Sequence, residues 1–330
     1  MVRTFSPLPA LLALALAAGP ALAQGGPRQY ESRIYTAVNR LRQGIEAHGW
    51  HFQVGPNPAM IHGRDRLCGF RPELAPPEFR AFETGGPENP GPFHELDASL
   101  LPGRYVGIFS NVKDQGSCGS CWAFATIGGL ESAYLKAHGA SPGVVTADGH
   151  VRPSATTPAF SEQQVLSCNP WGYSCNGGNF AFSMLMPSRA GRQGYYPGAV
   201  SAAAYPYIAQ DLTCAIPGQV TWTPVRTWGY VGSSWGTPSV TAIKTAIYRY
   251  GAVSSTVYAD DYFVGYKSGI FDGTDNRSQP NHAIQLVGWD DAKGAWLLKN
   301  SWSASWGIDG FMWIKYGVNS VGNATAWVSQ

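Results

Sequence analysis

Two cysteines lie three residues apart in the stretch DQGSCGSCWAF, at Cys118 and Cys121. Three kinds of chemistry use cysteines at this spacing: thiol–disulfide exchange, zinc binding, and nucleophilic attack by one thiol beside a structural cysteine. Each of them requires different companions elsewhere in the chain. The residues before the pair and the positions of the other cysteines, histidines and amides therefore distinguish among them.

The redox and zinc interpretations find little support. A thioredoxin-like pair belongs to a βαβ unit and has its reactive thiol first, whereas the preceding KDQGSC is polar and turn-like. Zinc needs four ligands, and Cys168 and Cys175, which could complete a set, have a spacing that fits no usual zinc ribbon. We therefore expect no metal and no other cofactor.

The nucleophilic interpretation requires a base for the thiol proton and a group that orients the base. Beyond residue 150 the sequence contains one histidine, His282 in NHAIQLVGWD, and Asn300 follows in LLKNSWSASWG. These residues match the nucleophile, base and orienting group of a catalytic triad. Cys121 opens a predicted helix, whose dipole, together with a His282 imidazolium, would favour a thiolate.

Five segments resemble, in order, the signature blocks of papain-type cysteine peptidases: QGSCGSCWAF, SEQQVLSC, CNGG, NHAIQLVGW and KNSWSASWGIDGF. The resemblance covers residues 93–330. It implies an α+β papain-like fold of two lobes with the active site in the cleft between them. The N-terminal lobe would be mainly helical, and the C-terminal lobe would be an antiparallel, β-barrel-like structure.

The resemblance also implies a role for each matching residue. Cys121 would attack the peptide carbonyl and form an acyl-enzyme, and His282 would transfer the proton. Asn300 would orient the imidazole, and Trp302 would shield the bond between them from water. Gln115 would donate to the oxyanion together with a backbone N–H.

Substrate alignment and disulfides follow from the same resemblance. Gly177 and Gly178 would bind an extended substrate through backbone hydrogen bonds, because glycine allows a close approach. Two disulfides are implied, Cys118–Cys175 and Cys168–Cys214.

One cysteine, Cys68 in HGRDRLCGFRPEL, remains without a role, and an odd cysteine in an exported protein needs an explanation. One hypothesis is a zymogen lock, a reversible Cys68–Cys121 disulfide made by a propeptide that crosses the cleft, as in some papain-like zymogens. A buried free thiol and an intermolecular bridge are the alternatives.

The chain divides into three parts. Residues 1–23 place one arginine before a short apolar run that ends in Ala-Leu-Ala, the layout of a secretory signal peptide. Residues 24–92 would be a propeptide and linker, with a helix over 30–48 and a Pro-, Gly- and Glu-rich linker over 71–92. Residues 93–330 would be the peptidase domain, in a secreted or periplasmic enzyme.

The predicted secondary structure that must position the site changes from mainly helix to mainly strand near residue 220. A helix is expected from Cys121 to about His138, followed by a long loop over 139–160. Later, β-rich runs such as AVSSTVYA, HAIQLVGWD and GFMWIKY alternate with turn signals, and TPSVTAIKTAIYRYG is expected to be helical. The first half is therefore predicted to be mainly α and the second mainly β.

The composition and charge argue against nucleic acid and membranes as binding partners. The net charge is +2 with no basic block, which gives no sign of nucleic acid, and no segment after the leader is apolar enough to span a membrane. We expect a monomeric endopeptidase that acts on peptides or proteins and is made as a zymogen inhibited by its own propeptide. An acyl-thioester transferase and a catalytically silent peptide-binding relative are the alternatives.

Overall fold

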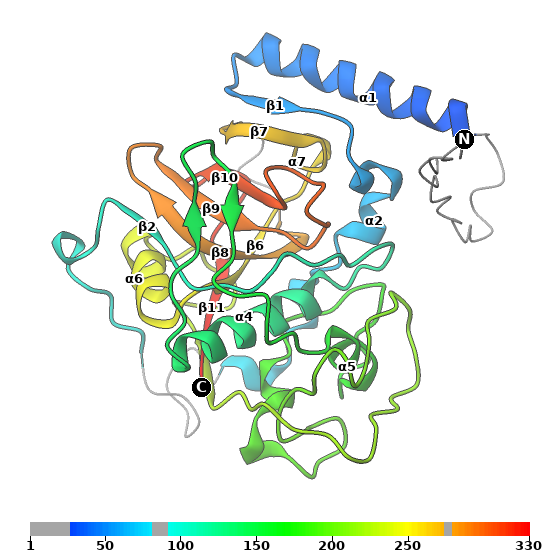
Figure 1. The fold of residues 1–330 in the computed structure, drawn as a ribbon, viewed down its shortest axis with the longest axis vertical. Coiled ribbons are helices and arrows are strands. Elements are labelled where there is room, and N and C mark those ends of the chain that lie inside the picture. The colour runs from blue at the N-terminus through cyan, green and yellow to red at the C-terminus, as the bar shows by residue number, and fades with distance from the viewer. Residues whose placement is uncertain (1–26, 81–91, 274–278) are drawn as a thin grey trace, which may run out of the picture.

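Helix α4 (Cys121–Ala137) lies at the centre of the protein, in a computed structural model that describes residues 27–80, 92–273 and 279–330. Nearly all of its side chains are buried, as expected for a helix that is apolar on most of its surface. The predicted signal peptide and residues 81–91 of the predicted linker lie outside the described residues. One mainly helical lobe and one mainly β lobe lie on either side of the start of this helix (Figure 1).

The helical lobe is built on α4 and on α5 (Glu162–Cys168). Ser161 caps α5 by accepting a hydrogen bond from the backbone N–H of Gln164. The rest of the lobe is largely irregular and includes the short helices η6 (Phe182–Leu185) and η7 (Pro187–Arg189). Large aromatic side chains fill its core, which lies under the site.

The β lobe is a nine-stranded sheet in the order β1-β7-β10-β9-β8-β6-β11-β5, with β2 paired to β8. Its strands are β1 (Phe52–Val54), β2 (Arg104–Val106), β5 (Thr227–Tyr230), β6 (Val253–Val257), β7 (Tyr266–Phe271), β8 (His282–Asp290), β9 (Ala295–Lys299), β10 (Phe311–Lys315) and β11 (Asn323–Ser329). The pairing is antiparallel, as expected for this lobe, except between β7 and β10, which pair in parallel. Helices α6 (Val240–Tyr250) and α7 (Asp261–Val264) complete the lobe.

Residues 27–80 dock on both lobes (Figure 1). Helix α1 (Pro27–His48) buries one apolar face against the β lobe, and β1 adds a strand to the sheet beside β7. The predicted linker is ordered over 71–80, where two short helices pack on the helical lobe. The short helices outside the two lobes are η2 (Pro58–Ile61), α2 (Arg64–Leu67), η3 (Pro72–Leu74), η4 (Pro77–Arg80) and η5 (Ala98–Leu100). None of the helices in the described ranges has the length and apolarity needed to cross a membrane.

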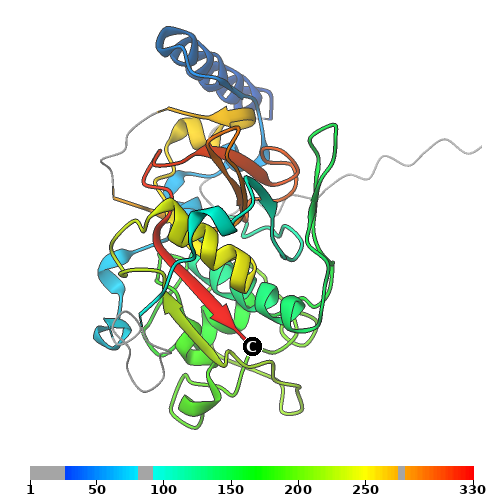
Figure 2. The same cartoon turned by 90° about the vertical axis from the view of Figure 1, so that its left-hand side faces the viewer.

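The segment 139–160, predicted to be a loop, contains a hairpin of β3 (Val144–Val145) and β4 (Val151–Arg152). It forms an arm along the side of the molecule (Figure 2). His150 of the arm lies 2.7 Å from a carboxylate oxygen of Asp309 in the β lobe. Strands of two residues are too short to give a periodic sequence signal, which explains the missed hairpin.

Candidate active site

The thiol of Cys121 lies where the two lobes and the pro-segment, residues 27–80, meet. Cys121 is the first residue of α4 and is completely buried. Its Sγ accepts a hydrogen bond from the N–H of Ala283 on β8, at 3.4 Å, and another from the N–H of Gly69 in the pro-segment, at 3.3 Å. A nucleophile at this position is therefore accessible only after the pro-segment moves.

The neighbouring strands β8 and β9 bring the predicted base and its orienting group together. His282 is the first residue of β8, and Asn300 directly follows β9, which pairs antiparallel with β8. The His282 Nε2 lies 2.8 Å from Asn300 Oδ1, so the imidazole donates this hydrogen bond in its Nε2–H form. Trp302 covers the imidazole at a ring-centroid distance of 4.5 Å and is itself 2% exposed.

Gln115 binds a peptide carbonyl beside the thiol. Its Nε2 donates to the carbonyl oxygens of Leu67, at 3.0 Å, and Cys118, at 2.8 Å. Its Oε1 accepts a hydrogen bond from the Ser301 hydroxyl at 2.7 Å, which fixes the orientation of the amide. The carbonyl of Leu67 thus occupies one of the two donors that the resemblance assigns to the substrate oxyanion. Ser301 was not predicted, because a serine beside an asparagine carries no signal of its own.

The pro-segment pairs with the glycine wall of the cleft. Gly178 donates its N–H to the Gly69 carbonyl at 2.9 Å and accepts from the Arg71 N–H at 2.9 Å. Between them, the N–H of Phe70 donates to the Asn281 carbonyl of the β lobe at 2.9 Å. The segment therefore lies across the site as an extended strand, the binding mode expected for a peptide substrate.

Three glycines make this close approach sterically feasible. A Cβ on Gly178 would lie 2.7 Å from ring atoms of Trp122, and a Cβ on Gly69 would overlap the carbonyl oxygen of Gly119. Gly177 has φ +129, a backbone conformation that favours glycine. Both the cleft wall and the strand that lies on it therefore need glycine.

Burial changes the charge state of the catalytic pair. It raises the pKa of Cys121 to about 11, and it lowers the pKa of His282 to about 4 despite the opposing hydrogen bond that the imidazole donates to Asn300. Both side chains are therefore neutral near pH 7 while the pro-segment covers them. The thiolate–imidazolium pair expected from the sequence concerns the uncovered site and stays a prediction; in the covered state, excluding water penalises both charges.

The six cysteines fall into two groups. The structure contains the disulfides Cys118–Cys175 and Cys168–Cys214. Cys68 and Cys121 are free, buried thiols, so the hypothetical lock between them is not formed here. Burial and the neighbouring Cys121 raise the pKa of Cys68 well above its ordinary value. Disulfide formation requires a thiolate, so two neutral thiols form a disulfide more slowly than ionised ones would.

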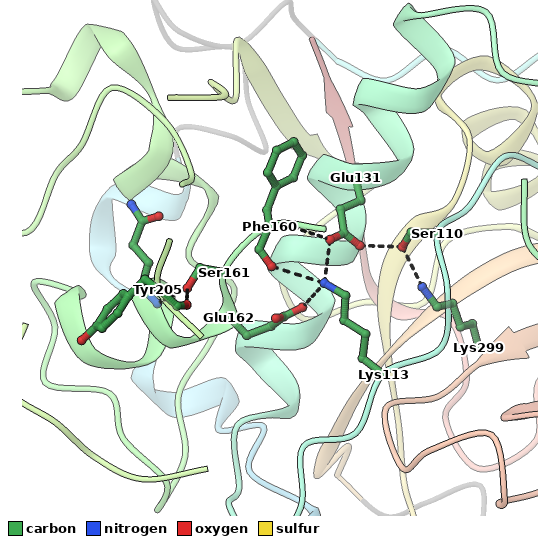
Figure 3. Close-up of polar contacts among 9 residues, drawn as sticks. Ser110, Lys113, Glu131, Phe160, Ser161, Glu162, Tyr205 and Lys299 are labelled. Carbon is green, nitrogen blue, oxygen red and sulfur yellow. Dashed lines mark hydrogen bonds and ion pairs between the residues drawn. The ribbon is translucent and has the colours of Figure 1, made fainter. Parts of the chain in front are cut away.

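A buried ionic network holds the lobes together behind the site (Figure 3). Glu131 of α4 accepts hydrogen bonds from Lys113, at 2.6 Å, and from Ser110, at 2.6 Å. Lys113 also donates to Glu162 at 2.5 Å, and Ser110 accepts from Lys299 at 3.0 Å. Lys299 ends β9, immediately before the asparagine of the site, so the network ties that strand to the helical lobe. Nothing in the sequence indicated this network, because its charged residues lie far apart in the chain.

Comparison with known proteins identifies the family. The family model described as "Papain family cysteine protease" matches residues 102–330. This chain belongs to the papain family. As a papain-family cysteine protease, it is a hydrolase, and the fold described above is that of its relatives.

Curated relatives and solved structures are consistent with this assignment. The papain-family chain is 34% identical over 266 residues to "Pro-cathepsin H" of Medicago truncatula, with 75% of this chain and 68% of the relative covered. It is also 34% identical to "Thiol protease aleurain" of Arabidopsis thaliana, with 70% and 61% covered. The matched region thus spans about two thirds of these relatives' length.

Two solved structures share the fold. The digestive procathepsin L2 proteinase from Tenebrio molitor larval midgut has a TM-score of 0.71 at 22% identity, with 92% of this chain and 91% of that chain covered. A recombinant stem bromelain precursor has a TM-score of 0.64 at 25% identity, with 92% and 91% covered. Coverage this high means that the shared fold includes residues ahead of the predicted peptidase domain.

Proposed function

We propose that this protein is the zymogen of an exported cysteine endopeptidase that works through Cys121, His282 and Asn300. The observation that carries the proposal is the hydrogen bond from Gln115 Nε2 to the carbonyl of Leu67, in a stretch whose Gly69 N–H bonds to the Cys121 thiol. A polypeptide already contacts the thiol and gives a carbonyl to the amide donor, which are two contacts that acyl transfer requires of a substrate.

The reaction begins when the pro-segment leaves and water returns. The Cys121 proton passes to Nδ1 of His282, because Nε2 is bonded to Asn300. Sγ then attacks the carbonyl carbon, and the oxyanion accepts hydrogen bonds from Gln115 Nε2 and the Cys121 N–H. His282 returns the proton to the leaving amine, which leaves an acyl-thioester. Water, deprotonated by His282, hydrolyses the thioester and regenerates the thiol.

The pro-segment is proposed to be the inhibitor of this reaction. Its residues 67–71 occupy the amide donor and the glycine wall and exclude water from the thiol. Cleavage within the Pro-, Gly- and Glu-rich residues 81–91 would free the domain that follows. The leader over 1–23 and two disulfides support export to an oxidising compartment, where the enzyme would act as a monomer on peptides or proteins, away from the membrane.

The test is hydrolysis of a fluorogenic peptide library by the processed chain, with Cys121→Ala as the inactive variant and Gln193→Ala, a substitution of an exposed residue of the same domain, as the control. We expect cleavage inside the peptides by the parent and by Gln193→Ala, and none by Cys121→Ala. Cleavage that persists in Cys121→Ala would contradict the proposed nucleophile. Diversion of the acyl product to an added amine would instead identify a transferase.

A further inference from the structure

The pro-segment has a second anchor, beyond the cleft. The side chain of Phe79 is only 1% exposed. Its ring packs edge-on against Trp171, at a centroid distance of 5.7 Å, and against Trp228, at 5.3 Å. Trp228 lies on β5, but its side chain belongs to the hydrophobic core of the helical lobe, so Phe79 reaches that core. An aromatic side chain buried in this way typically removes about 150–250 Å² of surface from water.

Polar groups beside the ring contact the preceding residue. One carboxylate oxygen of Glu78 accepts hydrogen bonds from Trp171 Nε1 and from the Tyr195 hydroxyl, each at 3.4 Å. The Arg192 guanidinium lies 4.9 Å from the centre of the Tyr195 ring and adds a positive charge near the carboxylate. We call the group Trp171, Tyr173, Tyr195 and Trp228 the aromatic seat. It contacts an acidic side chain and an aromatic side chain that are adjacent in sequence.

The aromatic seat is continuous with the catalytic cleft. The Tyr173 hydroxyl donates to the carbonyl of Leu74 at 2.7 Å, in the stretch of pro-segment between the cleft and Phe79. The Tyr173 ring also packs edge-on against Trp122, the residue after the nucleophile, at 5.2 Å. A single polypeptide can therefore lie in the cleft and in the seat at the same time, as the pro-segment does.

The seat and its occupant belong to different parts of the chain. Trp171, Tyr173, Tyr195 and Trp228 lie in the peptidase domain, whereas Glu78 and Phe79 lie in the pro-segment. Removal of the pro-segment uncovers the faces of Trp171 and Trp228 together with two hydrogen-bond donors. Exposed aromatic surface with convergent polar groups is the chemistry of a ligand site.

We propose that the aromatic seat is a second peptide-binding site, for a segment of a protein substrate in which an acidic residue is followed by an aromatic one. This proposal rests on the proposed removal of the pro-segment during maturation. It adds a substrate class to the proposed peptidase: proteins that carry such a pair at a distance from the bond that is cleaved.

The test uses the full-length chain and requires no proteolysis. Phe79→Ala removes the ring that holds residues 76–80 in the seat, so that this stretch can detach and a peptide can take its place. A fluorescently labelled peptide with the sequence of residues 76–80, Pro-Pro-Glu-Phe-Arg, is then titrated with each protein and its anisotropy is measured. We expect binding at least about tenfold tighter to Phe79→Ala than to the parent, whose seat is filled.

Matched variants distinguish the seat from nonspecific binding. In the Phe79→Ala background, Trp171→Ala should weaken peptide binding about tenfold or more, because it removes one wall and one donor. Trp222→Ala is the control, since Trp222 is a partly buried tryptophan of the same lobe that stacks on Tyr196 instead. It should leave the affinity unchanged. A peptide with alanine in place of phenylalanine should bind about tenfold more weakly.

The processed chain, alkylated at Cys121, provides a second measurement and should bind the same peptide as Phe79→Ala does. Equal binding by the parent and Phe79→Ala would overturn the proposal, as would equal loss in Trp171→Ala and Trp222→Ala. Far-UV circular dichroism confirms that each variant is folded. Because binding is measured without catalysis, inactivity towards peptides would contradict the proposed peptidase and leave the binding result standing.

Discussion

At the scale of single residues, one physical cause sets the state of the catalytic pair. Burial raises the pKa of Cys121 and lowers the pKa of His282. Both shifts favour the neutral form of the side chain, because the buried site penalises charge. The helix start favours a thiolate, but it does not outweigh the loss of water around the thiol. We therefore expect the covered site to be chemically silent as well as sterically blocked.

Alkylation of Cys121 measures this state directly. In the Cys68→Ala proform, Cys121 is the one free cysteine left by the two disulfides. We expect iodoacetamide to react slowly from pH 6 to pH 9, because the thiol pKa is about 11, and rapidly after processing. Mass spectrometry of the quenched protein gives the rate. Equal rates at pH 7 before and after processing would contradict the covered, neutral thiol.

Gln115 provides the second prediction at this scale. Its amide is fully buried and is held in one orientation by Ser301. Gln115→Ala should lower the kcat of the processed enzyme by about 100-fold or more, because one oxyanion donor is lost. Steady-state kinetics on a fluorogenic peptide measures this effect, with the exposed Gln193→Ala as control. A kcat within about twofold of the parent would remove Gln115 from the oxyanion site.

At the scale of elements, the buried network of Figure 3 anchors α4 to the segments around it. Glu131 binds Lys113, Ser110 and the backbone N–H of Phe160, so one helix residue holds two separate segments against α4. Burial lowers the pKa of Lys299 to about 8, which shows how strongly the interior penalises charge there. A partner lost from such a network leaves another charge buried without compensation.

Glu131→Ala should therefore lower the free energy of unfolding by about 3–5 kcal/mol. Glu46→Ala, an exposed glutamate on α1, serves as the control and should change it by no more than about 0.5 kcal/mol. Urea denaturation followed by tryptophan fluorescence measures both values. If the two substitutions cost the same, the network would not be what holds α4 in place.

The sequence predicted those elements whose pattern is local. The helix that begins at Cys121 and the strand that begins at His282 appear in the structure at the expected residues. The parallel pairing of β7 with β10 was missed because it depends on the register of segments far apart in the chain. The ordering of residues 71–80 was missed for a related reason: Phe79 finds its partners only after the helical lobe has folded.

At the scale of the whole molecule, the pro-segment joins the two lobes through separate contacts. α1 and β1 extend the β lobe, residues 67–71 cross the cleft, and Phe79 enters the helical lobe. The free energy of the covered state depends on keeping His282 neutral. Burial lowers the pKa of His282 to about 4 and also lowers that of His62 in the pro-segment.

These pKa shifts determine how the stability of the covered state changes with pH. An uncovered His282 takes up a proton near its ordinary pKa of about 6.5, whereas the covered one does so only near 4. The covered state is therefore fully favoured above about pH 6.5 and loses stability as the pH falls towards 4. The Tm of the Cys121→Ala proform should fall between pH 7 and pH 5. Adding His282→Ala should reduce that fall, and an unchanged fall would exclude His282 as its cause.

We propose that one chain holds both a cysteine nucleophile and the segment that silences it. The most direct measurement is the rate of hydrolysis of a fluorogenic peptide by the purified full-length protein, recorded before and after removal of the pro-segment, with Cys121→Ala alongside. We predict negligible hydrolysis by the full-length protein, rapid hydrolysis after removal, and none by Cys121→Ala at either stage. Equal rates before and after removal would contradict inhibition by the pro-segment, and hydrolysis by Cys121→Ala would contradict the nucleophile.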